Sequence, residues 1–179
     1  MTDAPLRIRD ARPDERDAIR DVTLAAYAEY ASLMEPSAWA LLEGAVLTGL
    51  DTTEPVHRIV AEADGRIVGS VMLYPPAAAA YDFAADARAR LPELRLLAVP
   101  PANRGRGVGR ALVDACVDRA RAMGAPALGL HTSRSMRIAT RMYVGMGFVR
   151  APEDDFQPPG AERVEAYRLP LVGGSGRGV

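Results

Sequence analysis

The sequence predicts a mixed α/β fold in which helices flank one central sheet. Short apolar segments typical of strands are separated by segments whose apolar residues recur at helical spacing. Asp64-Gly65 is a hairpin turn signal between two of these strands. A later strand leads into a glycine-rich turn at 104–109, which opens a helix. We therefore expect one domain over residues 1–172 and a flexible tail at 173–179, which is almost all glycine, serine and arginine.

The first half of the chain is predicted to contain three strands and two helices. Residues 6–9 alternate in polarity and form the first strand. A helix begins at Pro13, where proline and the acidic residues after it suit a first turn. A second helix covers 36–50, and the hairpin consists of strands at 56–63 and 66–74.

The middle of the chain contains the strand that leads to the glycine-rich turn. The segment before it, Pro75–Pro92, is rich in alanine and proline, and Asp82–Arg90 is interpreted as a loop or a short helix. The strand covers Glu93–Val99 and ends at Pro100-Pro101, because proline has no N–H for a sheet ladder. Strict alternation predicts one face made of Glu93, Arg95, Leu97 and Val99, and the other of Leu94, Leu96 and Ala98.

The remaining elements alternate in type. Gly147 is a natural stop for the last helix, and the proline- and acid-rich segment after Phe148 is typical of a loop. The predicted elements are a helix at 107–123, a strand at 127–131, a helix at 135–146, a loop at 151–161 and a strand at 164–171.

The turn Arg104-Gly105-Arg106-Gly107-Val108-Gly109 has the chemistry of an anion site. Glycine lets backbone N–H groups approach a ligand closely, and a helix start presents unpaired N–H groups with partial positive charge. The arginines add formal charge, so the turn suits a phosphate or pyrophosphate. The alternative is that the glycines only tighten a strand–helix connection.

Two other phosphate motifs fit less well. A Walker loop needs a lysine, and this chain contains none. A dinucleotide fingerprint would place glycine or alanine where Arg110 or Leu112 stands, and its glycines would follow the strand directly.

The third interpretation rests on a resemblance. Arg-x-x-Gly-x-Gly at 104–109, after a strand that ends Leu97-Ala98-Val99, resembles the acyl-CoA-binding motif of the GNAT superfamily of N-acyltransferases. The series Ala139-x-x-x-Tyr143-x-x-x-Gly147-Phe148 resembles the closing motif of the same superfamily. One departure is Met136, where the family often has an asparagine that contacts the cofactor.

The resemblance implies a mostly antiparallel mixed sheet whose central strands splay apart, flanked by helices. The pantetheine arm of acetyl-CoA would lie in that opening, bonded to the backbone of Leu97 and Val99. The cofactor-binding residues that it implies are Leu97, Ala98, Val99, Arg104, Gly105, Arg106, Gly107, Val108, Gly109 and Arg110.

The chemistry implied is transfer of an acetyl group from acetyl-CoA to a primary amine of a small molecule or peptide. Tyr143 is the candidate acid, since the resemblance puts it beside the CoA sulfur and a tyrosine stays protonated at neutral pH. Glu93 is the candidate base, because some family members carry a catalytic glutamate there. The alternatives are a core aromatic for Tyr143 and a solvated strand-start carboxylate for Glu93.

The acceptor is not identified by the sequence. The residues that would suit a cationic amine are acids and aromatics of the first two helices and the loop before the last strand: Tyr27, Glu29, Tyr30, Glu35, Trp39, Asp154, Asp155 and Phe156. The alternative is an ordinary surface that carries acids and a few rings. A second hypothesis for the whole protein is a non-catalytic acyl-CoA-binding sensor or interaction module.

Composition argues against several other classes of function, among them nucleic-acid binding and metal binding. The net charge of −1 and the absence of a basic stripe argue against a nucleic-acid binder. Cys116, the only cysteine, is expected to pack in the core, and His57 and His131 have no spaced ligand partners, so no metal site is predicted. No apolar run reaches the length of a membrane span, and we expect a cytoplasmic protein. The resemblance allows a homodimer.

Overall fold

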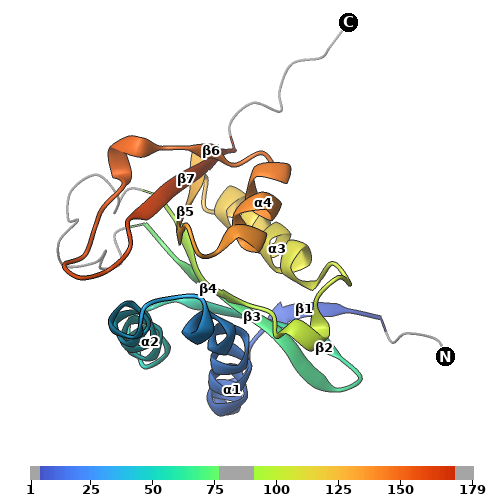
Figure 1. The fold of residues 1–179 in the computed structure, drawn as a ribbon. Coiled ribbons are helices and arrows are strands. Elements are labelled where there is room, and N and C mark those ends of the chain that lie inside the picture. Colours follow the sequence, from blue (N-terminus) through green and yellow to red (C-terminus); the bar gives the residue numbers. More distant parts are fainter. Residues whose placement is uncertain (1–4, 77–90, 172–179) are drawn as a thin grey trace, which may run out of the picture.

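The computed structural model describes residues 5–76 and 91–171 (Figure 1). The interpretation of Asp82–Arg90 as a loop or short helix and the flexible tail at 173–179 lie outside these residues. Within them, seven strands form one sheet in the order β1-β2-β3-β4-β5-β7-β6. Their bounds are β1 Arg7–Asp10, β2 His57–Ala63, β3 Arg66–Tyr74, β4 Glu93–Ala98, β5 Ala127–Ser133, β6 Val149–Arg150 and β7 Val164–Pro170.

The sheet is mixed and mostly antiparallel, as predicted. Strands β4 and β5 form a parallel pair, and the other neighbouring strands of the described sheet pair antiparallel. The β2–β3 hairpin turns at Asp64 and Gly65, whose φ angles of 50° and 70° are those of a tight type I′ turn. The expected hairpin signal is therefore confirmed.

Helices cover both faces of the sheet. α1 (Arg16–Tyr27) and α2 (Pro36–Leu50) lie on one face, and α3 (Val108–Ala122) and α4 (Arg137–Gly145) on the other (Figure 1). Each face has its own core: Ile19 and Val46 pack with Val60 and Met72 on the first, and Leu112 packs with the other face of the sheet. The first helix begins as a short 3₁₀ turn, Pro13–Glu15, and after Tyr27 it continues as a second 3₁₀ turn, Ala28–Ser32.

The predicted alternation along β4 is wrong because the strand carries one extra residue. Ser70 of β3 pairs with Ala98, whereas Met72 pairs with Arg95, so three steps on β4 oppose two on β3. Leu96 absorbs the difference with a left-handed φ of 51°. As a result Leu94 packs on the α3 side with Leu97, while Leu96 packs on the α1 side.

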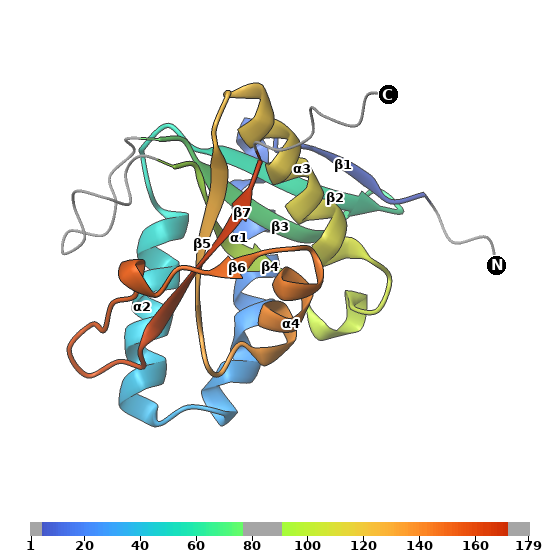
Figure 2. The same cartoon turned by 90° about the horizontal axis from the view of Figure 1, so that it is seen from above.

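The two central strands separate just beyond this irregularity. β4 pairs with β5 only at Glu93↔Gly129 and Leu94↔Leu130, although the strands continue to Ala98 and Ser133. In Figure 2, β5 and β7 run at a wide angle to β2 and β3. The splay implied by the resemblance is present, and we call it the β4–β5 opening.

Candidate active site

A cavity of about 50 Å³ lies in the β4–β5 opening. Where β5 moves away, the backbone N–H and C=O groups on that edge of β4 lose their strand partners, and such groups need hydrogen bonds from a ligand or water. The residues that line the cavity come from several different elements. The lining residues are Ala26, Tyr27 and Tyr30 below, Leu94–Leu97 of β4, His131 and Thr132 of β5, and Met136, Ala139 and Tyr143 around α4.

Tyr143 is held rigidly in the wall of this cavity. The N–H groups of Gly147 and Phe148 donate to the carbonyls of Val144 and Tyr143, each at 3.0 Å, so α4 ends in a Schellman motif that needs the left-handed φ of 96° at Gly147. The Phe148 ring packs on Tyr143 with centroids 5.6 Å apart. Burial raises the pKa of Tyr143 well above its usual value of 10, so its hydroxyl keeps its proton at neutral pH.

Glu93 is a buried carboxylate at the narrow end of the opening. Its oxygens accept hydrogen bonds from His131 Nδ1 at 2.9 Å and from Arg95 Nη2 at 3.0 Å. Burial alone would raise its pKa, but His131 and Arg95 together outweigh burial and hold the pKa at about 2. Glu93 is therefore ionised, and its two partners, His131 and Arg95, line the cavity.

His131 is the site residue that sequence reasoning missed. Its Nε2 lies 3.3 Å from the carbonyl oxygen of Asp154, and its ring packs against Phe156 with centroids 5.3 Å apart. Each ring nitrogen of His131 therefore has an oxygen acceptor within reach. Because His131 is 38 residues from Glu93 in the chain and they meet only through the β4–β5 register, no local motif could have paired them.

The glycine-rich turn has the predicted geometry of an anion site. Gly105 and Gly107 have left-handed φ angles of 76°, and Gly107 is the N-cap of α3, which has no side-chain cap. The first amides of α3 therefore remain available for a ligand. A side chain at Gly109 would come within 3.3 Å of Met142 Sδ, so glycine also lets α3 approach α4 closely.

The side chain of Arg104 is engaged by protein groups rather than directed at a ligand. Its Nε donates to the carbonyl of Val99 at 2.9 Å, and its two terminal nitrogens bond both oxygens of Glu29. The hydrogen bonds that Arg104 donates to Glu29 raise the pKa of Arg104 above its usual value. Arg104 thus ties the glycine-rich turn to the 3₁₀ turn after α1. Arg110 lies on the exposed face of α3, 4.0 Å from Asp114.

The acids predicted for an acceptor site largely have partners already. Glu29 binds Arg104, Asp154 binds Arg168, and Asp155 binds Arg150 and Arg163. Among the aromatic residues predicted for the acceptor site, Tyr27 and Tyr30 line the cavity, and Trp39 packs against the core on the α1 side of the sheet. This distribution favours aromatic contacts over a bare carboxylate for recognition.

Cys116 packs in the core, as expected. It is fully buried on α3, and burial raises the pKa of its thiol to about 12.

Over the described ranges, no group of three or more histidine, cysteine, aspartate or glutamate side chains has the arrangement of a metal site. No helix in those ranges is long and apolar enough to cross a membrane.

Comparison with known proteins links this geometry to one family. Residues 18–148 match the Acetyltransferase (GNAT) family. A mycothiol acetyltransferase of Sanguibacter keddieii is 38% identical over 96 residues, which are 54% of this chain and 29% of that protein. The chain spans about a third of the length of the curated relatives that it matches.

Solved structures show the same fold at low identity. A GCN5-related N-acetyltransferase from Rhodopseudomonas palustris aligns with a TM-score of 0.68 and 20% identity, covering 96% of this chain and 99% of that one. A GNAT family acetyltransferase from Brucella melitensis, in complex with acetyl-CoA, aligns with a TM-score of 0.57 and 21% identity, covering 98% and 94%.

Proposed function

The chain belongs to the GNAT acetyltransferase family, and we propose that it transfers an acetyl group from acetyl-CoA to a primary amine of a small molecule or peptide. The observation that carries this proposal is the β4–β5 opening with an uncapped, glycine-rich helix start at its mouth. It combines an unpaired strand edge for an extended arm with free amides for phosphates.

Acetyl-CoA is proposed to lie along the unpaired edge of β4. The backbone of Leu97 and Val99 would bond the pantetheine arm, with Ala98 between them. The pyrophosphate would meet the amides of the turn and of α3 at Gly105, Arg106, Gly107, Val108, Gly109 and Arg110. Because Arg104 is occupied by Glu29, its proposed part in binding is to hold the turn in place.

Tyr143 is the proposed acid. The acceptor nitrogen attacks the thioester carbonyl carbon, the C–S bond breaks, and the Tyr143 hydroxyl gives its proton to the leaving sulfur. The base that takes the proton of the acceptor nitrogen later releases it to solvent, and solvent returns a proton to the Tyr143 hydroxyl. A protonated, buried tyrosine in the cavity wall supports this role.

Glu93 is the proposed proton acceptor, acting through His131. A carboxylate with a pKa of about 2 is a weak base by itself. His131 lines the cavity and bonds Glu93 through Nδ1, so a ring with its single proton on Nδ1 can take a proton from the acceptor nitrogen at Nε2 while the Nδ1 proton moves to the Glu93 carboxylate. This requires the long 3.3 Å contact to the carbonyl of Asp154 to open.

The function is tested by following free thiol from acetyl-CoA with a panel of amines and identifying products by mass. Cys116, the only cysteine, is buried, so a thiol reagent reports released CoA. The panel should hold alkyl amines, peptides with a free N-terminus and unacetylated mycothiol, because curated relatives are named mycothiol acetyltransferases. We expect thiol release that depends on one amine class.

Binding of acetyl-CoA without turnover on any amine would instead support the second candidate, a non-catalytic acyl-CoA sensor. Met136, where the family often has a cofactor-contacting asparagine, is the observation that favours it.

A homodimer and a cytoplasmic location are further proposals, which rest on the resemblance and are checked by sedimentation and by cell fractionation.

A further inference from the structure

A second cavity, of about 410 Å³, lies where β5 ends and α4 begins. Its lining residues are Ser133, Arg134, Arg137, Thr140, Arg141 and Glu165, and none of them lines the cavity in the β4–β5 opening. We call it the α4 cavity. It is a separate space beside the same helix that carries Tyr143.

Ser133 lines this cavity and carries an unsatisfied polar atom. The residue is 9% exposed, its Oγ is buried, and this oxygen has no hydrogen-bond partner among the described residues. A buried hydroxyl without a partner loses its hydration and gains nothing in return, so such atoms usually mark a missing ligand or water. Ser133 Oγ can donate one hydrogen bond and accept others.

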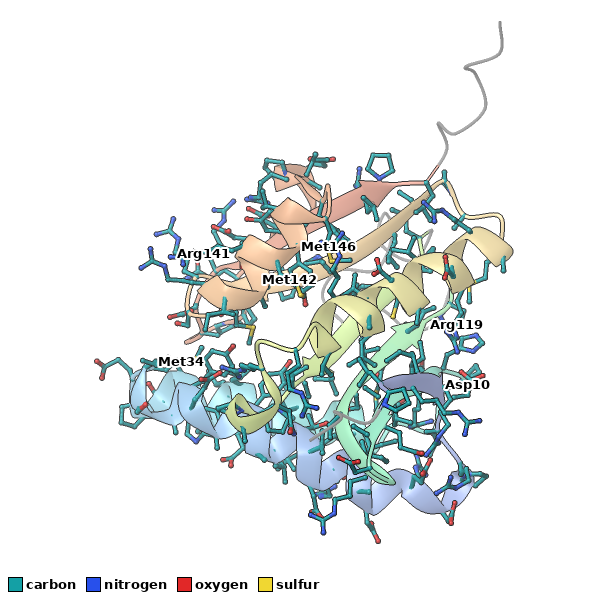
Figure 3. All side chains as sticks on the ribbon, turned by 90° about the vertical axis from the view of Figure 1, so that its right-hand side faces the viewer. Asp10, Met34, Arg119, Arg141, Met142 and Met146 are labelled. Atoms are coloured by element: carbon teal, nitrogen blue, oxygen red, sulfur yellow. The ribbon has the colours of Figure 1, made fainter. Side chains whose placement is uncertain are left out.

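The surroundings of Ser133 are positively charged. Arg137 and Arg141 are exposed, lie one helical turn apart, and make no ion pair within the described ranges. α4 begins with Met136 as its N-cap and has no side-chain cap, so its first amides add partial positive charge. In Figure 3, Arg141 points outward from α4, whereas Met142 and Met146 lie between α4 and α3.

The negative charge of Glu165, the acidic residue that lines the α4 cavity, is balanced by neighbouring arginines. Glu165 lies 3.7 Å from Arg134 and 4.0 Å from Arg150, and it accepts a hydrogen bond from the Tyr167 hydroxyl at 3.4 Å. Its charge is therefore shared by two arginines, and the cavity keeps an excess of positive charge from Arg137 and Arg141.

We propose that the α4 cavity binds a phosphate-type anion, with Ser133 Oγ donating a hydrogen bond and Arg137 and Arg141 supplying charge. The ligand class is inorganic phosphate or a small phosphate monoester, since a compact dianion matches one hydroxyl, two guanidinium groups and a helix start. This site is distinct from the turn at 104–109, which opens α3 rather than α4.

The site would act on the helix that carries Tyr143. An anion at the start of α4 stabilises a nine-residue helix whose own N-terminus is uncapped. Occupancy is therefore expected to raise the thermal unfolding temperature, independently of acetyl-CoA.

The test is calorimetric titration of inorganic phosphate, and separately of glycerol 1-phosphate, at low ionic strength. Each titration is run with the protein alone and with the protein saturated in acetyl-CoA. We expect one phosphate per chain to bind in the presence of acetyl-CoA. Loss of all phosphate binding on adding acetyl-CoA would assign the phosphate to the cofactor's own site and overturn the proposal. A preference for one of the two ligands identifies the source of the phosphate group.

Variants localise the binding. The double substitution Arg137→Gln and Arg141→Gln should weaken phosphate binding at least about a hundredfold, and Ser133→Ala about tenfold, in line with two charged contacts and one neutral one. Arg121→Gln, at an exposed arginine of α3 that pairs with Asp118 at 3.7 Å, is the matched control and should change binding less than about twofold. Equal binding by the double variant and the wild type would contradict the proposed site.

Ser133→Ala also separates a ligand site from a structural role. Because Ser133 Oγ has no partner in the part of the chain that the structure describes, its removal should leave the unfolding temperature unchanged or higher without phosphate, and should reduce the rise that phosphate causes. A lower unfolding temperature in phosphate-free buffer would mean that Oγ has a stabilising partner, and the proposal would fall.

Discussion

Tyr143, the proposed acid, illustrates how the surroundings of one residue set its protonation and fix its ring. Its hydroxyl is kept protonated by burial, and its ring is fixed by Phe148. We predict that Tyr143→Phe lowers turnover by about a hundredfold or more, the usual range for a positioned acid, and leaves acetyl-CoA affinity within about threefold. Free-thiol kinetics and titration of acetyl-CoA measure the two quantities. Turnover equal to wild type would remove Tyr143 from the mechanism.

Gly107 illustrates a backbone requirement. Its left-handed φ of 76° at the N-cap of α3 disfavours any side chain, although no atom blocks a Cβ. Gly107→Ala should lower the free energy of unfolding by about 1–2 kcal/mol and weaken acetyl-CoA binding. Gly44→Ala, within α2 and equally unobstructed, is the control and should gain up to about 1 kcal/mol. Equal effects of the two substitutions on urea unfolding would contradict this explanation.

Sequence reasoning located backbone features that depend on local motifs and missed a side-chain contact that depends on strand register. The glycines of the turn and the stop at Gly147 follow from short motifs, and the structure places them as expected. The partnership of Glu93 with His131 depends on how β4 and β5 align, which the local sequence does not encode.

At the scale of elements, Arg104 and Glu29 join the glycine-rich turn to the segment after α1. Both side chains are more than two-thirds buried and form a two-pronged pair. A double-mutant cycle with Arg104→Gln and Glu29→Gln should give a coupling free energy of about 0.5–1 kcal/mol in urea unfolding. The Arg20–Asp51 pair, which is more exposed, is the control with a smaller coupling. Zero coupling for Arg104 and Glu29 would mean that the link does not hold the two elements together.

The irregularity in β4 shows what the polarity pattern of a strand cannot predict. Polarity predicts which segment is a strand, and β4 ends one residue from the predicted boundary. Alternation cannot reveal an inserted residue when apolar side chains follow on both faces, as at Leu94, Leu96 and Leu97. The extra residue reverses the faces of the first half of the strand relative to the second.

For the whole molecule, buried and paired carboxylates predict sensitivity to acid. The pKa of Glu93 and that of Glu15 are both lowered from 4.5 to about 2 in the folded state: Glu93 by His131 and Arg95 against burial, Glu15 mainly by its hydrogen bond to Arg9. A lowered pKa contributes stability above the unfolded value, and this contribution is lost as pH falls from about 4.5 toward 2.

The measurement is urea unfolding at pH 7, 4 and 3. The free energy of unfolding should decrease steadily below pH 4.5, and Glu93→Gln should be less stable at pH 7 but lose less on acidification. A constant difference between wild type and Glu93→Gln at all three pH values would show that Glu93 does not titrate with folding.

The elements of the fold were predictable because the local signals in the sequence, such as apolar spacing and turn residues, agree with the structure that forms. Helices at Pro36–Leu50 and around 108–122, the hairpin and the last strand all follow from local signals. The mostly antiparallel character of the sheet and its splay came from the resemblance. The strand order was not predicted, since non-neighbouring strands such as β5 and β7 pair without any local signal.

The most direct test of the central claim, that the β4–β5 opening with its glycine-rich turn holds acetyl-CoA, is thermal unfolding of ligand-free protein with and without acetyl-CoA. At about 100 times its dissociation constant, a ligand of the folded state adds about 2.7 kcal/mol, which is several degrees for a chain of this size. We predict such a shift with acetyl-CoA, absent with ATP or NAD and reduced in Gly107→Ala. No shift with acetyl-CoA, or an equal shift with all three ligands, would contradict the account.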